Sequence, residues 1–488
     1  MKKQETISPI ARRTAKVRVI RVAVFMLAFY TLTAIAFIIP LRPTYSEMES
    51  RDLAKFPTFS VETLLNGQYF LDIDTWFSDT FPFRDKWVLL NSYITQGFGV
   101  QTVQIHGDVG TADEIPAIPT RPPTFAPVVT EPTEETTTTT EITTTQTGTA
   151  TDTEETTTTV TTTTTTVSTS STATTTTTKP KEQNKVPTES NGAVLTVGDS
   201  GYEYYHFYQK AADMYIASVN TLAQQLSGVA TVYDMIVPTS IDIALDPSVR
   251  NDVNSSNQQQ AIAYMYGSMS QSVKTIDLFS AFTKAQKAGD YLYFRTDHHW
   301  TALGAYRAYQ QFCAAKGKAA TPLSNYNVYE FTGYLGSFYR DTQSNMMKAK
   351  PDTVWAYEPK STDSMTIYTS SGSSTYPIIT DVSDWSSLYK YNCFIGGDNP
   401  LTVMQNPNKT DGSACLLIKE SYGNAYAPFL VEDYQTVYVL DYRYFDEVDS
   451  RSIAQFVKDN KIKDVLLLNN ISATRNEDLM DSLSALVK

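Results

Sequence analysis

The sequence predicts an α/β fold in which a parallel sheet carries helices on both faces. Short apolar runs alternate with helical segments along the C-terminal third of the chain, and the links between them are short. This alternation is typical of parallel sheets built from strand–helix–strand units. Open parallel sheets bind ligands beyond the carboxyl ends of their strands. A site is therefore expected at that edge of the sheet.

Three strands and three helices are expected in the C-terminal third. Each strand is a short, strongly apolar run, and a helix follows each one after a polar link. In chain order the strands are residues 414–418, 436–441 and 464–468, and the helices are residues 425–434, 450–460 and 476–487. The strand ends place Ser421, Arg443 and Asn470 along one rim of the sheet.

Two further strands are expected earlier in the chain. Residues 230–237 follow a helix at residues 208–226, and residues 275–278 follow a helical stretch at residues 257–273. Residues 333–400 are rich in tyrosine, serine and glycine and lack clear periodicity. We interpret them as a long insertion that covers or shapes the site.

The N-terminus has the pattern of a membrane signal anchor. Residues 1–21 carry seven lysines and arginines and predict a cytoplasmic tail. Residues 22–40 are almost wholly apolar and long enough for one transmembrane helix. Residues 34–36 resemble a signal-peptidase site but lie inside the apolar run, so an uncleaved anchor is favoured over a cleaved signal peptide. The rest of the chain is expected outside the cytoplasm, held at the cell membrane.

A threonine-rich segment divides the remaining chain. Residues 130–178 contain 31 threonines in 49 positions and almost no large apolar side chains. Such a segment buries too little surface to fold, so residues 113–188 predict a disordered linker, plausibly a glycosylated stalk; the alternative is an ordered threonine-rich β structure. Residues 46–110 and 190–488 either pack together around this loop or form a membrane-proximal module and a catalytic domain carried on a stalk.

Charge and cysteine content exclude several classes of protein. The net charge is −13, and basic residues concentrate at the predicted membrane end, which argues against binding to nucleic acid. The three cysteines, Cys313, Cys393 and Cys415, do not have the spacing of metal ligands. One pair could form a disulfide outside the cell. No zinc-type cluster appears, so neither a metal nor a cofactor is expected.

Residues 295–301, Arg-Thr-Asp-His-His-Trp-Thr, hold two of the four histidines. Thr301 is expected to cap a helix at residues 302–316, which places His299 at a loop rim. Asp297 can bond the far ring nitrogen of His299, fix its tautomer and stabilise its charged form. His298 is expected to point elsewhere and Trp300 to serve packing, so both are assigned to the surroundings of the site. The alternative is a hydrogen-bonded turn without chemistry.

Two serines compete as the nucleophile that His299 would activate. Gly198-Asp199-Ser200 has the letters of lipase-like hydrolases, but strand-like aromatic sequence follows it, which favours a hairpin turn. Ser421 directly follows a buried strand and precedes a helix, where backbone N–H groups can face a developing oxyanion. Gly423 would let a substrate approach the backbone closely. The alternative for Ser421 is a helix-capping serine.

The sequence resembles the DHHW family of exported bacterial proteins, which are similar to the alginate O-acetyltransferase-like branch of the SGNH hydrolase superfamily. The resemblance rests on residues 296–301, on residues 418–424 with 428–430, and on residues 439–445, and it extends to residues 77–85. It implies a three-layer SGNH-like domain with the permuted order Asp297, His299, Ser421. Glu420 departs from the family, which more often has aspartate before the serine.

The resemblance also implies roles and partners. Ser421 would be the nucleophile, His299 the general base and Asp297 its orienting carboxylate. The Ser421 N–H and an asparagine, Asn470 or its neighbour Asn469, would bind the oxyanion. The implied activity is O-acetyl transfer to a cell-surface or secreted polysaccharide, with a membrane-bound O-acyltransferase as acyl donor. An acetyl esterase and a non-catalytic envelope binding protein are the alternatives.

Overall fold

The computed structural model describes residues 23–27, 30–31, 42–46, 51–65, 68–84, 86, 103–119 and 192–488. The chain divides into two compact units, Met1–Val129 with Thr188–Lys488, and Thr130–Pro187. All described residues belong to the first unit. Most of the predicted anchor at residues 22–40 and of the predicted linker lies outside the described residues. Within the described ranges, no helix is long and apolar enough to cross a membrane.

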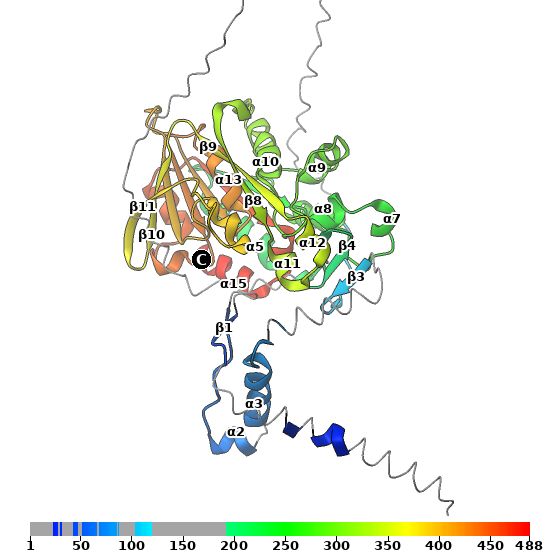
Figure 1. The fold of residues 1–488 in the computed structure, drawn as a ribbon. Coiled ribbons are helices and arrows are strands. Elements are labelled where there is room, and N and C mark those ends of the chain that lie inside the picture. Colours follow the sequence, from blue (N-terminus) through cyan, green and yellow to red (C-terminus); the bar gives the residue numbers. More distant parts are fainter. Residues whose placement is uncertain are drawn as a thin grey trace, which may run out of the picture. The chain divides into compact units, whose positions relative to one another are not determined.

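An eight-stranded sheet forms the centre of the fold. Its order is β11-β10-β12-β14-β13-β15-β6-β7. The strands are β6 (Thr231–Val237), β7 (Val273–Thr275), β10 (Ser364–Thr369), β11 (Gly372–Pro377), β12 (Leu401–Gln405), β13 (Ala414–Lys419), β14 (Thr436–Asp441) and β15 (Asp464–Asn470). The five strands from β14 to β7 are mutually parallel, whereas β12, β10 and β11 join antiparallel at one edge (Figure 1). The predicted α/β class is confirmed, but the sheet is mixed rather than purely parallel.

Two apolar cores cover the two faces of this sheet. Alternate residues of β6 divide between them, with Met235 in one core and Ile236 in the other. One face is covered by α9 (Leu278–Lys287), α10 (Ala302–Ala315), α13 (Gly423–Leu430) and the β8–β9 ribbon (Tyr326–Tyr334 and Asp352–Pro359). The other face is covered by α5 (Gln209–Gln225), α8 (Gln258–Ser268), α14 (Ile453–Asp459) and α15 (Glu477–Leu486). Helices on both faces were predicted, and the alternation of apolar segments explains them.

The predicted elements of the C-terminal third agree with the structure to within a few residues. Each predicted strand is buried on both faces, which is why it reads as a continuous apolar run. The Thr301 hydroxyl caps α10 by accepting from the Gly304 N–H at 3.2 Å, as predicted. The fold also contains short helices: α6 (Ser240–Ile243) and α7 (Pro247–Arg250), with one-turn segments at Leu323–Asn325, Phe445–Glu447 and Ile471–Arg475.

The predicted insertion at residues 333–400 is more than a cover over the site. It supplies β10 and β11, which extend the central sheet, and β9, which pairs with β8. It also holds α11 (Ser337–Thr342), α12 (Asn345–Ala349) and the short helix η2 (Ser387–Cys393). The expected insertion was not predicted to contain strands. β11 is exposed along its whole length, so its sequence shows no apolar alternation.

A small antiparallel sheet joins residues from both sides of the threonine-rich segment. β3 (Val103–His106) pairs with β4 (Val194–Val197), which forms a hairpin with β5 (Ser200–Glu203) (Figure 1). Residues 113–119 also pack here, because the Asp113 N–H donates to the Phe207 carbonyl and its carboxylate accepts from the Gln209 N–H. These residues, which we assigned to the linker, belong to the folded domain.

Residues 42–86 include their own short elements. These are β1 (Tyr45–Ser46), β2 (Arg51–Asp52), α2 (Val61–Leu65) and α3 (Gln68–Asp79). The Arg42 guanidinium lies 4.1 Å from the centre of the Trp76 ring and donates to the Thr80 hydroxyl at 2.8 Å. The Asp79 carboxylate accepts from the Ala54 N–H at 2.8 Å. These contacts tie the two ends of the segment to α3.

Candidate active site

Ser421 lies in a tight connection between β13 and α13. The strand ends at Lys419 and the helix begins at Gly423, so the serine stands at the carboxyl edge of the parallel sheet. A Cβ atom on Gly423 would lie 2.4 Å from the Cβ atom of Lys419, and the connection therefore requires glycine there. Gly423 was expected to admit substrate; the structure instead gives it a packing role against Lys419.

The loop at residues 295–299 brings the histidines to this connection. The Trp300 indole N–H donates to the Tyr422 carbonyl at 2.9 Å, and the Tyr422 hydroxyl donates to the His298 carbonyl. Trp300 is completely buried and lies near Phe282 and Tyr426. Two hydrogen bonds in opposite directions thus lock the loop onto the residue that follows Ser421.

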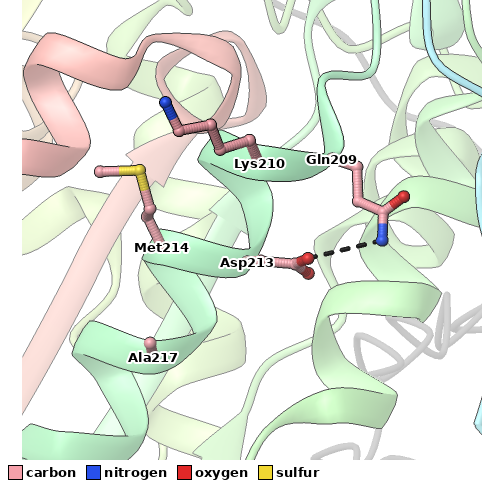
Figure 2. Close-up of a pocket in the computed structure, with 5 residues that line it drawn as sticks. All are labelled: Gln209, Lys210, Asp213, Met214 and Ala217. Carbon is pink, nitrogen blue, oxygen red and sulfur yellow. Dashed lines mark hydrogen bonds between the residues drawn. The ribbon is translucent and has the colours of Figure 1, made fainter.

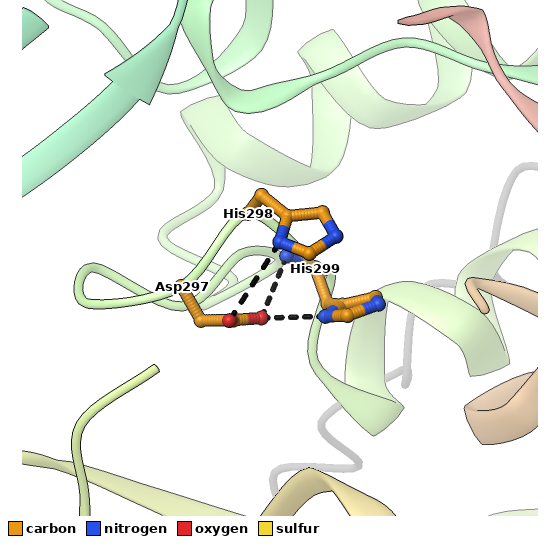
Figure 3. Close-up of side chains that lie close together, drawn as sticks. All are labelled: Asp297, His298 and His299. Carbon is orange, nitrogen blue, oxygen red and sulfur yellow. Dashed lines mark hydrogen bonds and ion pairs between the residues drawn. The ribbon is translucent and has the colours of Figure 1, made fainter. Parts of the chain in front are cut away.

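Ser421, His299 and Asp297 form one hydrogen-bonded row. The Ser421 hydroxyl oxygen lies 2.8 Å from His299 Nε2, and His299 Nδ1 lies 2.6 Å from Asp297 Oδ1. Figure 3 shows the Asp297 carboxylate beside both histidines, with dashed lines that join it to the His298 ring and to the His299 ring. A proton on Nδ1 that is donated to Asp297 leaves the Nε2 lone pair facing the serine hydroxyl. This is the arrangement that a serine nucleophile and its base require.

Backbone groups and a glycine fix the Asp297 carboxylate. Oδ1 accepts from the His299 N–H at 2.9 Å, and Oδ2 accepts from the Ser337 N–H at 2.8 Å. A Cβ atom on Gly336 would lie 2.3 Å from Asp297 Oδ2, so only glycine allows this approach. Burial alone would raise the pKa of Asp297, but the nearby His299 and His298 and these hydrogen bonds hold it well below its usual range. The carboxylate therefore stays ionised.

We predicted that His298 would point away from the site, but its ring lies beside His299. Its Nδ1 lies 2.7 Å from the Ser337 hydroxyl and 3.7 Å from Asp297 Oδ2, and the centres of its ring and the His299 ring are 3.8 Å apart. The prediction assumed an extended loop, but residues 295–299 are a run of bends that folds the ring back. His298 therefore helps to enclose His299.

Asp297, His298 and His299 are also the one group of described residues with the chemistry of a metal site. One ligand atom from each lies within 4.8 Å of the others. A metal ion at this point would need the lone pair of His299 Nδ1, which faces Asp297 at 2.6 Å. A metal ion and the Asp297 carboxylate thus compete for one nitrogen of His299. The hydrogen bond present is the one by which Asp297 orients His299.

The three predicted oxyanion donors differ in their hydrogen-bond partners. No acceptor among the described residues takes the Ser421 N–H, which leaves it available at the nucleophile. The Asn470 side-chain oxygen accepts from the Ala473 N–H at 3.2 Å, and the Asn470 backbone N–H donates to the Glu420 carboxylate at 2.8 Å. The Asn469 side chain accepts from the Tyr442 hydroxyl at 2.9 Å and belongs to the opposite face of the sheet. Asn469 is therefore not beside Ser421.

Glu420 holds the ends of two strands together. One carboxylate oxygen accepts from the Asn470 N–H at 2.8 Å, and the other accepts from the Tyr422 N–H at 3.1 Å and lies 3.2 Å from the Ser421 hydroxyl. The residue that departs from the family pattern thus ties the nucleophile connection to the end of β15.

Arg443 is engaged in a buried charge cluster rather than open to a ligand. Its guanidinium lies 2.6 Å from Asp441 and 2.9 Å from Asp398. The Lys419 ammonium lies 2.7 Å and 3.1 Å from the same two carboxylates. The expected role of Arg443 in binding substrate is therefore replaced by support for the end of β13, two residues before Ser421.

Tyr391 is a site residue that the sequence did not indicate. Its ring stacks on the His299 ring with centres 3.9 Å apart and an angle of 14° between the planes. Its hydroxyl donates to the Ser421 carbonyl at 3.1 Å. Neither periodicity nor a motif marks this residue, which lies in the region interpreted as an insertion.

The rival serine and a surface pocket lie apart from this row. Ser200 begins β5 of the predicted hairpin, and the neighbouring Asp199 pairs with Arg295 at 2.8 Å. The pocket in Figure 2 is lined only by residues of α5, which covers the other face of the sheet from His299. These lining residues are Gln209, Lys210, Asp213, Met214 and Ala217. The three cysteines are buried and form no disulfide with one another.

Comparison with known proteins identifies a matching family and similar solved structures. The chain matches the family model of DHHW proteins over residues 49–440. The structure is similar to that of a DHHW family protein from Eubacterium siraeum, with 27% sequence identity and a TM-score of 0.52, over 60% of this chain and 95% of that chain. No curated protein matches the sequence.

Two further solved structures show a weaker similarity to this one. PatB1 from Bacillus cereus, solved with a sulfonyl adduct, has 21% identity and a TM-score of 0.49 over 59% of this chain and 97% of that chain. The O-acetyltransferase domain of AlgJ from Pseudomonas putida has 14% identity and a TM-score of 0.34 over 59% of this chain and 96% of that chain. Because the family model spans most of the sequence, and the motif at residues 296–301 lies within it, this chain belongs to the DHHW family.

Proposed function

We propose that this protein is an O-acyltransferase that works through an acyl-serine on Ser421. The observation that carries the proposal is the row of hydrogen bonds in which His299 Nε2 lies 2.8 Å from the Ser421 hydroxyl and Nδ1 lies 2.6 Å from Asp297. The low pKa of Asp297 keeps an ionised carboxylate behind the imidazole, as its role requires. A base so oriented can activate a serine.

In the first half of the reaction, the Ser421 oxygen attacks the carbonyl carbon of an acyl donor. His299 Nε2 takes the hydroxyl proton as the new C–O bond forms, and the carbonyl oxygen becomes an oxyanion. The Ser421 N–H is the donor available to that oxygen. Collapse of the intermediate breaks the bond to the donor group, which leaves with the proton from His299.

In the second half, a hydroxyl of the acceptor attacks the acyl-serine. His299 takes the acceptor proton while the new ester bond forms, then returns it to the Ser421 oxygen as that bond breaks. The acyl group has moved from donor to acceptor, and the serine hydroxyl is regenerated. Asp297 stabilises the imidazolium in both halves and remains ionised throughout.

The exposure of the site favours a short acyl group and a reaction sheltered from water. Ser421 and His299 are each 7% exposed, which leaves little space around the nucleophile for a long chain. We propose acetyl as the group and a cell-surface or secreted polysaccharide as the acceptor. The proposed anchor at residues 22–40 would hold the domain at the outer face of the membrane, where a membrane-bound O-acyltransferase would supply the acyl group.

The experiment is to trap the acyl-serine. The purified ectodomain is incubated with an activated acetyl ester, quenched in acid and analysed by peptide mass spectrometry. We expect acetyl on the peptide that contains Ser421, no acetyl there in Ser421→Ala, and wild-type labelling in Ser200→Ala, the matched control. Labelling that survives in Ser421→Ala would refute the proposal.

The acceptor is tested separately. Addition of an oligosaccharide should speed loss of the label and yield an acetylated sugar. Loss of the label only as free acetate, at a rate that no sugar changes, would identify an acetyl esterase. Absence of any label would identify a protein that binds without catalysis.

A further inference from the structure

Tyr391 contacts the side chain of His299 and the main chain of Ser421. It lies on η2, between β11 and β12, and is buried. Its ring stacks on His299, and its hydroxyl donates to the main-chain carbonyl of Ser421 at 3.1 Å. One side chain thus ties the proposed base to the proposed nucleophile.

The imidazole of His299 is enclosed on both faces. The ring centres of Tyr391 and His298 lie 3.9 Å and 3.8 Å from that of His299. At such separations two rings cannot share one face without overlapping each other, so they lie on opposite faces. His298 is itself fixed by the Ser337 hydroxyl at 2.7 Å. The neighbouring rings therefore restrict rotation of the His299 ring and shield both of its faces from bulk water.

The stacked ring favours the charged form of His299. The face of an aromatic ring carries negative charge and attracts a cation placed over it. The imidazolium that forms when His299 takes the serine proton lies in that position. The Tyr391 hydroxyl remains protonated, because burial raises its pKa well above the usual range and the charges of Glu420 and Asp297 raise it further. It therefore keeps its bond to the Ser421 carbonyl.

We propose that Tyr391 is a positioning residue that holds His299 in line with Ser421 and stabilises the imidazolium formed in each half of the reaction. This inference rests on the proposed function of Ser421 and His299. Tyr391 acts through these residues, since its ring face and its hydroxyl are both used within the protein. The other titratable or charged groups around His299 are Asp297, His298, Tyr422, Glu420, Tyr334 and Arg340.

The test compares Tyr391→Leu and Tyr391→Phe with the wild-type ectodomain. Leucine keeps the site apolar but removes the ring, whereas phenylalanine keeps the ring and removes only the hydroxyl. Labelling of Ser421 by an activated acetyl ester is measured from pH 5 to 9. Tyr215→Leu is the matched control, because it removes a buried tyrosine from the core on the opposite face of the sheet. Thermal unfolding confirms that each variant is folded.

We expect Tyr391→Leu to slow maximal labelling by about 10- to 100-fold, as misplacement of a base commonly does. Its rise with pH should move to lower pH by about 0.5 to 1 unit, because the imidazolium loses the stacked ring. Tyr391→Phe should restore the pH profile and most of the rate. In steady-state assays with an acceptor, kcat should fall in Tyr391→Leu while the acceptor KM stays within about twofold.

Several results would overturn the inference. Wild-type rate and pH profile in Tyr391→Leu would show that the ring has no positioning role, and a slowing equal to that of Tyr215→Leu would show only a loss of stability. A raised acceptor KM at constant kcat would assign Tyr391 to substrate binding instead. If the wild-type protein is not labelled at Ser421 at all, the proposed function fails, and that result is distinct from the others.

Discussion

Asp297 Oδ1 lies 2.6 Å from His299 Nδ1, on the opposite side of the ring from the nitrogen that faces Ser421. Three residues of one loop thus supply both the base and its orienting carboxylate. The carboxylate accepts from two backbone N–H groups as well, so its own position does not depend on the histidine. The tautomer of His299 is therefore set before any substrate binds.

Asp297→Asn should lower kcat/KM for an activated acetyl ester by about 10³- to 10⁴-fold. Asparagine can keep the size of the side chain, but an amide that donates toward Nδ1 selects the tautomer whose Nε2 carries a proton. That nitrogen then cannot accept from Ser421. Asp199→Asn, which changes a carboxylate outside the row, is the comparison, and its loss should be much smaller. A kcat/KM of Asp297→Asn within threefold of the wild-type value would contradict the assigned role of Asp297.

Gly336→Ala should reduce activity although residue 336 is not part of the row. The added methyl would overlap Asp297, since a Cβ atom there lies 2.3 Å from Oδ2. The carboxylate must move, and a displacement of about 1 Å can cost about 100-fold in rate. Gly110→Ala is the control, because its nearest neighbour, a ring nitrogen of His206, is at an ordinary 3.9 Å. Equal kcat values for the two variants would show that the fit at Gly336 is not needed.

The parts of the site that the sequence could predict are those held by local structure. Ser421 follows a strand buried on both faces, whose continuous apolar run is easy to recognise, and Asp297 and His299 are adjacent enough to be paired by spacing. Tyr391 and Ser337 are different. Ser337 reaches Asp297 from 40 residues away, through a tertiary contact that no local pattern encodes.

The incorrect predictions also arise from tertiary contacts that no local sequence pattern encodes. The strand β11 is exposed along its whole length and so shows no apolar alternation, which hid the antiparallel edge of the sheet. Arg443 does follow a strand, as predicted, but Asp441 and Asp398 hold its guanidinium. Asn469 lies within β15, and the alternation of that strand directs its side chain to the opposite face of the sheet. Strand ends can be predicted from sequence; the partners that side chains find there depend on the whole fold.

Asp234 should make the protein less stable as the pH rises from about 4 to about 7. Burial raises its pKa to about 7, partly offset by a hydrogen bond from the Tyr215 hydroxyl. The folded state thus holds a proton that the unfolded chain releases near pH 4, so the stabilisation is complete below pH 4 and is lost as the pH rises toward 7. At about 1.4 kcal/mol per pH unit, the loss approaches 4 kcal/mol at most.

The measurement is urea unfolding of the ectodomain from pH 4 to 8, with Asp234→Asn beside the wild type. Asparagine does not titrate and can still accept from the Tyr215 hydroxyl. The variant should therefore show a flatter dependence on pH across this range. Parallel curves for the two proteins would show that Asp234 does not hold a proton in the folded state.

Lys419→Met should destabilise the fold and, through it, the site. The ammonium is completely buried between Asp441 and Asp398, and removing one partner of a buried ion pair typically costs about 3–5 kcal/mol because the other charges stay buried. The effect should depend on pH. Burial would raise the pKa of Asp398, but Arg443 and Lys419 depress it. Its ionisation therefore stabilises the fold above the unfolded pKa near 4, and that contribution is lost as the pH falls.

Without Lys419 the pKa of Asp398 is lowered less, so acid unfolding of Lys419→Met should begin at a higher pH than that of the wild type. The double variant Lys419→Met with Asp441→Asn tests the coupling, because neutralising one carboxylate leaves Arg443 paired with Asp398. It should be more stable than the sum of the two single losses predicts, by about 1–3 kcal/mol. Strict additivity would mean that the four charges act independently of one another.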